Sequence, residues 1–336
     1  MDILLAEALG KPVWAWLIFV GLVIGLLAFD LGVLHRKSHE IGVRESLLLS
    51  AFYITIGALF SLWIWRSMGA APAVDYLTGF VVEKSLAMDN IFVIAMIFGY
   101  FGVPRAYQHR VLVYGIIGVL ILRGVMIGAG AAVVNEFEWV LMLFAAFLIF
   151  TGIKMLRSGD EVYDVSANPV LRILRRRLPL TETLHGERFF VRQPDEATGR
   201  LRLFATPLFL ALVMVEIADV IFAVDSIPAI FAITTDPYIV YTSNIFAILG
   251  LRALFFALSA MMHRFVYLKT ALSLVLIFIG AKVFAAELSG VEKIPPMLSL
   301  GVTLAILVGG VAYSLWRTRR EGGAVITPAP APEPGA

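Results

Sequence analysis

The stretch VEIADVIFAVDSIPAIFAIT, residues 215–234, is long and apolar enough to cross a bilayer. It nevertheless contains three carboxylates, Glu216, Asp219 and Asp225. One ionised Asp at the centre of a membrane helix costs roughly 2.5–3.5 kcal/mol on insertion scales. Glu216 and Asp219 share one helix face because they are three residues apart, whereas Asp225 lies on another. Pro228 removes a backbone donor, so we expect a helix break just before it that turns Asp225 toward Asp219.

The rest of the chain places this stretch in a membrane protein. Of its 336 residues, 60% are hydrophobic and only 15% are charged, and the mean hydropathy is +0.89. The apolar runs are long and do not alternate with a period of two, which predicts helices and not a barrel. We therefore expect an all-α, polytopic transmembrane helix bundle of about nine spans. The predicted spans are 13–34, 46–65, 75–101, 111–133, 138–156, 205–234, 239–262, 268–287 and 296–316.

Basic residues are distributed unevenly over the loops between these spans. One set of alternate loops holds 18 Lys and Arg residues and the other set holds 3. By the positive-inside rule this predicts an N-terminus outside and a C-terminus in the cytoplasm. Residues 1–316 then form the transmembrane transporter domain, interrupted by a basic cytoplasmic loop at 157–204. The Pro/Ala-rich tail at 317–336 should be disordered.

Two parts of the chain resemble each other at nearly constant offsets of 130, 129 and 128 residues. Ordered matches in three successive spans predict an internal repeat, with repeat one at 75–156 and repeat two at 205–287. The matched segments are MDNIF (88–92) with ADVIF (218–222), LILRGVM (120–126) with LGLRALF (249–255), and FLIFTGIKML (147–156) with VLIFIGAKVF (275–284).

Each match pairs two like-charged residues. The pairs are Asp89 with Asp219, Arg123 with Arg252, and Lys154 with Lys282. Because each repeat has three spans, an odd number, the two repeats are inverted in the membrane. Inverted repeats are typical of secondary transporters, whose binding site lies near the midplane where the repeats meet.

The charged and polar residues inside the spans form a candidate cation site. Carboxylate, amide and hydroxyl oxygens are hard ligands that suit Mg²⁺, Ca²⁺ or Mn²⁺. The candidate metal ligands are Glu83, Asp89, Asn90, Glu216, Asp219, Asp225 and Ser226. The candidate charge-compensating residues are Arg123, Arg252, Lys84, Lys154 and Lys282. The alternative interpretation is structural, with acids and bases forming ion pairs that hold the helices together.

Several function classes lack a sequence signature. The chain contains no cysteine, so it has no disulfide, thiolate metal site or cysteine nucleophile. It has no Walker A loop, no HExxH motif and no nucleophile elbow, which argues against an enzyme and against transport driven by nucleotide hydrolysis. We expect no prosthetic group and no nucleic-acid partner. The partners expected are the bilayer, a divalent cation and possible coupling protons, and the oligomeric state stays open.

Three segments carry a resemblance to a known family. EKSLAMDNIFV (83–93), VEIADVIFAVDSIPAIFAIT (215–234) and FDLGVLHRKSHEIGVRES (29–46) resemble the TerC family of integral membrane proteins, especially its Alx-like branch. The resemblance implies a LysE-like transporter in the bacterial inner membrane. It also implies manganese export and a link to tellurium resistance and alkaline-pH stress. The motif positions carried over are Glu83, Asp89, Asn90, Glu216, Asp219, Asp225 and Ser226.

The sequence therefore favours a divalent-cation exporter, with Mn²⁺ as the first candidate and proton exchange as a possible coupling. The outward direction rests on the resemblance alone. A second hypothesis is a membrane assembly or stress-complex scaffold that holds partners through the basic loop at 157–204. One further acid, Asp30, lies at the end of span one, where we expect it to pair with Arg36 or Lys37 or to line an exit.

Overall fold

A computed structural model provides the three-dimensional structure of the chain. It describes residues 7–8, 10–32, 42–137, 139–157, 164–194, 200–259, 268–289 and 295–320. The segments 33–41 and 321–336 lie outside the described residues. The predicted partners Arg36 and Lys37, and the predicted disorder of residues 321–336, are therefore not addressed by it.

The described residues are mostly helical. The helices are α2 (Val13–Gly32), α3 (Val43–Met68), α4 (Ala70–Tyr100), α5 (Arg105–Glu136), α6 (Trp139–Arg157), α7 (Pro169–Arg177), α8 (Pro207–Phe231), α9 (Pro237–Ile248), α10 (Leu251–Ser259), α11 (Leu268–Ser289) and α12 (Pro296–Arg320). The strands are β1 (Glu7–Ala8), β2 (Lys11–Pro12), β3 (Phe190–Pro194) and β4 (Leu201–Ala205), which form two antiparallel pairs.

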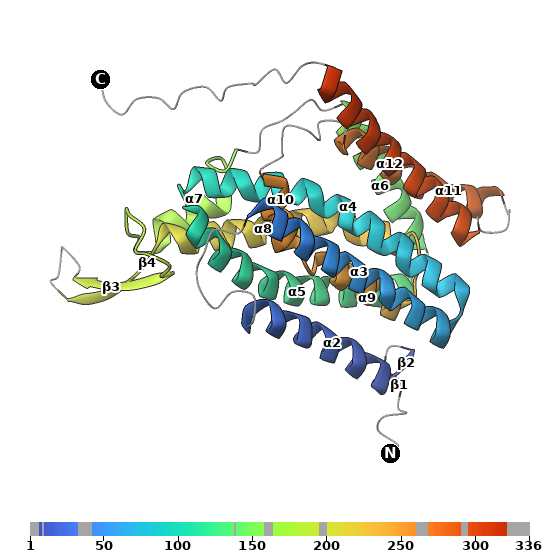
Figure 1. The fold of residues 1–336 in the computed structure, drawn as a ribbon, viewed down its shortest axis with the longest axis horizontal. Coiled ribbons are helices and arrows are strands. Elements are labelled where there is room, and N and C mark those ends of the chain that lie inside the picture. The colour runs from blue at the N-terminus through green and yellow to red at the C-terminus, as the bar shows by residue number, and fades with distance from the viewer. Residues whose placement is uncertain are drawn as a thin grey trace.

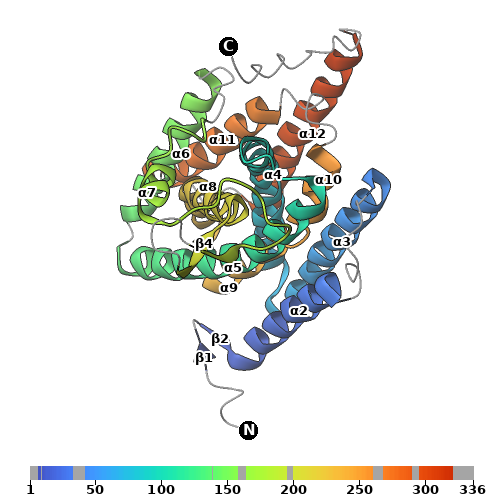
Figure 2. The ribbon, with the colours of Figure 1, turned by 90° about the vertical axis from the view of Figure 1, so that its left-hand side faces the viewer.

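The long helices form one bundle (Figure 1). Viewed along the bundle, α4 and α8 lie at its centre, with α5 and α9 on one side and α6 and α11 on another (Figure 2). Helices α2 and α3 lie at the outside, as does α12 (Figure 2). The central position of α4 and α8 places Glu83 and Asp219 inside the protein.

The predicted all-α transmembrane bundle is confirmed. Among the described residues, eight helical segments are long and apolar enough to cross a membrane. Helix α4 is not one of them, because Asp75, Glu83, Lys84 and Asp89 are spread along it. It is nevertheless 31 residues long and occupies the centre of the bundle (Figure 2), so with it the described part of the chain contains nine candidate spans. Packing inside the protein allows a span to carry charges that lipid would not accept.

The two repeats contact each other reciprocally. Helices α6 and α11 pack closely through Gly152 and Gly280, which are equivalent at the offset of 128 residues. A Cβ on Gly152 would lie 2.8 Å from the Ser273 carbonyl oxygen, and one on Gly280 would lie 2.6 Å from the Ala145 carbonyl oxygen. Ser273 and Ala145 are themselves equivalent, so each repeat contacts the other through the same surface. This is the pattern of an internal two-fold axis.

The break in the helices lies in span seven and not in span six, so the prediction of a break before Pro228 is wrong. Helix α8 continues through Asp225 to Phe231 with Pro228 inside its last turn, so the backbone hydrogen bond that the proline removes there does not end the helix. The predicted span 239–262 is instead divided into α9 and α10. Gly250 between them has a φ of 80°, a left-handed conformation that favours glycine.

The segment between α6 and α8 contains a short helix and a hairpin. Asn168 caps α7 by accepting a hydrogen bond from the Val170 N–H at 2.9 Å. Strands β3 and β4, which we did not predict, form a hairpin beyond one end of the bundle (Figure 1). At the C-terminus, α12 continues to Arg320, so residues 317–320 are helical where we expected the disordered tail to begin.

The reciprocal glycine contact generates a stability prediction. Gly152→Ala and Gly280→Ala should each destabilise the protein by roughly 1–3 kcal/mol, because the new methyl group overlaps a backbone oxygen of the facing helix. Thermal unfolding in detergent measures the effect. Gly301→Ala in α12 is the control, since nothing lies within 4 Å of a Cβ there. Equal stability of all three variants would contradict the close contact between α6 and α11.

Candidate functional site

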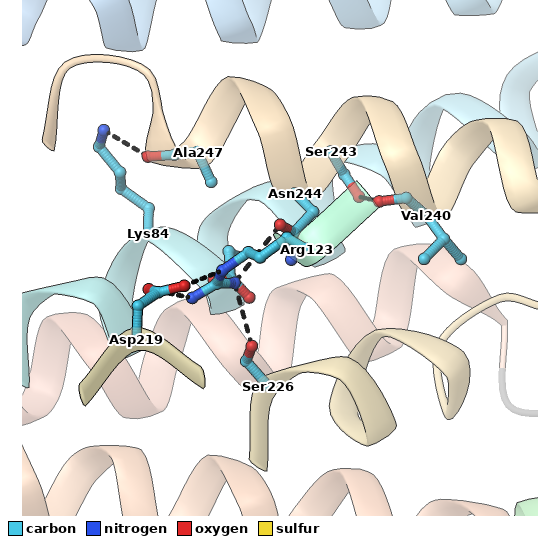
Figure 3. A network of polar contacts seen from close by, with 9 residues as sticks. Lys84, Arg123, Asp219, Ser226, Val240, Ser243, Asn244 and Ala247 are labelled. Atoms are coloured by element: carbon cyan, nitrogen blue, oxygen red, sulfur yellow. Dashed lines mark hydrogen bonds and ion pairs between the residues drawn. The ribbon is translucent and has the colours of Figure 1, made fainter. Parts of the chain in front are cut away.

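A buried arginine connects the two repeats at the centre of the bundle (Figure 3). Arg123 of α5 donates from Nε and Nη2 to the two carboxylate oxygens of Asp219 in α8, at 3.1 and 3.0 Å. Its Nη1 forms an ion pair with Oε1 of Glu83 in α4. The same nitrogen lies 3.1 Å from Ser226 Oγ and 3.4 Å from Asn244 Oδ1. We call these five residues the Arg123 network.

The Arg123 network is almost completely removed from solvent. Arg123 is 1% exposed, Glu83 0% and Asp219 6%. A buried guanidinium is stable only if its donors are used, and a bidentate carboxylate uses two of them in a fixed geometry. One cation faces two carboxylates here, so the network has more acidic oxygen than Arg123 alone can neutralise if both acids are ionised. That surplus is a property expected of a cation site.

A small cavity lies next to the network. Its volume is about 20 Å³, which is room for about one water molecule or one bare ion. Asn90, Asp219 and Arg252 contribute polar groups to its otherwise apolar lining. The Asn90 side-chain oxygen is buried and has no hydrogen-bond partner among the described residues. A buried oxygen without a donor is ready to accept one or to bind a cation.

Glu216 lies beside the same cavity. Its carboxylate packs against α5 at Gly118, where any side chain would overlap it, and lies near Gly115, which lines the cavity. Its Oε2 is buried without a hydrogen-bond partner among the described residues. Glu216 and Asp219 share one face of α8, as their spacing predicts. The sequence thus brings Glu216, Asp219 and Asn90 to one region.

A second arginine, Arg252 of α10, holds another polar cluster. Its Nη2 forms an ion pair with Asp30 of α2, and its Nη1 lies 2.7 Å from Nε2 of His109 in α5. Asp30 therefore pairs with a residue distant in sequence, in addition to any contact with the segment that follows it. Since Arg252 also lines the cavity, the cavity lies between the two arginine clusters.

Asp225 and the lysines lie apart from this region. Asp225 is half-buried on another face of α8 and accepts a hydrogen bond from Thr151 Oγ1 of α6 at 3.4 Å. It does not turn toward Asp219, because the expected helix break is absent. Lys154 is exposed in the last turn of α6, and Lys282 contacts Ser299 of α12 at 3.3 Å. Neither lysine forms an ion pair within the Arg123 network.

Lys84 also has a different partner from the one expected. Its Nζ donates to the carbonyl oxygens of Ala247 and Leu249, at 2.8 and 3.1 Å, where α9 ends. Asp89 belongs to α4, but its side chain lies outside the described residues, so its predicted role as a ligand stays a prediction. Among the described residues, no three His, Asp or Glu side chains are placed to hold a metal ion together.

Two members of the polar clusters were missed by sequence reasoning. Asn244 is the most polar residue of the segment TSN (242–244) inside an apolar span, a signal that could have identified it. His109 lies five residues into α5, and only the position of Arg252 in the fold shows its relevance.

The Arg123 network generates a second stability prediction. Arg123→Met should destabilise the protein by about 3–5 kcal/mol, because Glu83 and Asp219 lose their shared counter-charge in a buried site. The triple variant Arg123→Met, Glu83→Gln, Asp219→Asn should recover a large part of that loss, since no uncompensated charge remains. Thermal unfolding of the purified variants measures both. A triple variant less stable than Arg123→Met would show that the network is not a coupled unit.

Comparison with known proteins agrees with this architecture. The family model described as "Integral membrane protein TerC family" matches residues 68–322. An "Uncharacterized membrane protein" of Rickettsia bellii is 46% identical over 303 residues, which cover 90% of this chain and 97% of that protein. The "Putative membrane-bound redox modulator Alx" of Escherichia coli is 43% identical over 324 residues, 94% of this chain and 98% of that one. No solved structure matches the chain.

The family model covers most of the chain, and the matched region contains the whole Arg123 network and both repeats. The chain belongs to the TerC family of integral membrane proteins.

Proposed function

We propose that this protein exports a divalent cation across the bacterial inner membrane, with Mn²⁺ as the first candidate. The observation that carries the proposal is the collection of buried acidic and amide oxygens between two reciprocally packed repeats. Glu83 and Asp219 belong to the Arg123 network, and Asn90 and Glu216 lie beside the adjoining cavity. Oxygen donors of this kind suit Mn²⁺, Mg²⁺ and Ca²⁺.

Arg123 competes with any substrate cation for the carboxylates of the site. Its guanidinium uses both oxygens of Asp219 and one oxygen of Glu83. A divalent cation can bind these carboxylates only if Arg123 moves away or shares them. Competition of this kind would partly neutralise the carboxylates when no substrate is bound, and it would favour release of the ion by lowering its affinity.

Proton exchange is the coupling that we propose. The carboxylates that release a cation can accept protons in its place, which keeps the charge of the buried site nearly constant. The Escherichia coli relative carries the name of a putative redox modulator. Because this chain has no cysteine, a shared redox role would not use a thiol of its own.

The loop charges support an orientation with the N-terminus outside and the C-terminus in the cytoplasm. Arg110 of α5 contacts Glu187 at 3.4 Å, and Arg175 of α7 lies 5.6 Å from the Tyr100 ring at the end of α4. These contacts gather the basic segment at one end of the bundle.

Single cysteines can test that orientation without background, because the native chain has none. In intact cells with a permeabilised outer membrane, a cysteine at exposed Ala71 should react with a membrane-impermeant maleimide. One at exposed Asp164 should react only after the inner membrane is opened. The reverse pattern would invert the topology.

The central test measures Mn²⁺ efflux. Asp219→Asn should lower the rate of Mn²⁺ release from loaded proteoliposomes at least about ten-fold, or about 1.4 kcal/mol in the transport barrier, because the site loses a charged ligand. Asp164→Asn, in an exposed loop, is the matched control and should transport normally. Thermal unfolding of each variant separates lost transport from lost folding.

The scaffold hypothesis predicts a different pattern. Under it, the Arg176→Gln, Arg177→Gln variant of exposed α7 would lose the cellular phenotype, while Asp219→Asn would keep both phenotype and manganese content. Normal Mn²⁺ release by a folded Asp219→Asn protein would refute the exporter proposal.

A further inference from the structure

The break between α9 and α10 leaves a helix end inside the protein. Most residues of the span 237–257 are buried, and Ala247 and Leu249 are 0% and 1% exposed. The last carbonyl groups of a helix have no partner within it, and together they carry a partial negative charge. In a membrane protein such carbonyls need a donor or a cation, because no lipid group can supply one.

Lys84 meets this need. Its ammonium group donates to the carbonyl oxygens of Ala247 and Leu249, and the residue is 6% exposed. Figure 3 shows its side chain directed at Ala247 and away from Asp219 and Arg123. The neighbouring acid, Glu83, is held by Arg123 on the other side. The positive charge of Lys84 therefore lies against two backbone carbonyl oxygens.

The internal repeat shows that the lysine and the break occur together. At the offset of 130 residues, Lys84 of α4 corresponds to Met214 of α8. At the offset of 129, Gly250 corresponds to Ile121, where α5 continues without interruption. Repeat one thus presents Lys84 to the broken helix of repeat two, whereas repeat two has a methionine at the equivalent position and the helix of repeat one is continuous. This difference between the repeats indicates that Lys84 satisfies the carbonyl groups at the break between α9 and α10.

We propose that the end of α9 is a monovalent-cation site that the Lys84 ammonium fills permanently, in place of a free Na⁺ or K⁺. Backbone carbonyls at the C-terminal ends of broken helices are the groups with which transporters bind such ions. A tethered ammonium supplies the same charge without a dissociable ion. The consequence for transport, which rests on the proposed function, is that cation export draws no driving force from a Na⁺ or K⁺ gradient.

Removing the Lys84 ammonium should leave the carbonyl oxygens of Ala247 and Leu249 open to a free cation. Lys84→Met copies the residue found at the equivalent position, Met214, and should lower the unfolding temperature by about 5 °C in choline chloride. NaCl or KCl at the same ionic strength should restore a large part of this loss, because a free ion can bind the vacated carbonyls. Lys282→Met is the matched control: it removes a lysine that contacts a hydroxyl group, and its stability should be the same in all three salts.

Two results with Lys84→Met would overturn the proposal. One is a stability equal to that of the wild type, and the other is a loss that is identical in choline, sodium and potassium salts.

If Lys84→Met does not fold, measurements on the wild-type protein test whether the site is permanently filled. Its unfolding temperature should be the same in the three salts, and Mn²⁺ release from proteoliposomes should not change when choline replaces Na⁺ and K⁺. Stabilisation of the wild type by Na⁺ or K⁺ over choline, or transport stimulated by their gradient, would refute a permanently filled site. Absence of any Mn²⁺ transport would reject the proposed function instead, and the unfolding measurements would still test the site.

Discussion

The architecture depends on neutralising one guanidinium in the middle of a membrane protein. Arg123 is buried from solvent and would be unstable there without Asp219 and Glu83. The three residues come from α5, α8 and α4, so their pairing fixes the relative position of both repeats at the centre of the bundle. The same contact occupies both oxygens of Asp219 and one oxygen of Glu83, so another cation must share them with Arg123 or displace it. A substrate ion would thus compete with the contact that stabilises the fold, because both use the same carboxylates.

The two repeats share a sequence pattern but differ in shape. Their outer helices, α6 and α11, contact each other through equivalent glycines. Their inner helices differ, because α5 is continuous where α9 and α10 are separated at Gly250. The predicted repeats therefore differ in conformation at the level of their inner helices. Lys84 of the repeat with the continuous helix contacts the carbonyl oxygens at the broken end.

The sequence predicted the bundle well because hydropathy and internal repetition are properties of whole segments. It also assigned Glu83 and Asp219 to one candidate site with Arg123 as a charge-compensating residue, since buried charges need partners in an apolar bundle. It misplaced the helix break, because α8 continues through Pro228, whereas the break lies at Gly250, whose φ is 80°. The partners of Lys84, Arg252 and Asp225 depend on tertiary contacts over many residues, such as Ala247 and His109. No local pattern encodes such contacts.

The central claim is that Asp219 binds a hard divalent cation in competition with Arg123. Equilibrium binding of Mn²⁺ to the purified protein tests it most directly, with the electron paramagnetic resonance signal of the free ion as the readout. The account predicts a saturable site in the wild type that is lost in folded Asp219→Asn and can be competed by excess Mg²⁺ or Ca²⁺. Saturable binding that is unchanged in Asp219→Asn, or no binding to the wild type, would contradict it.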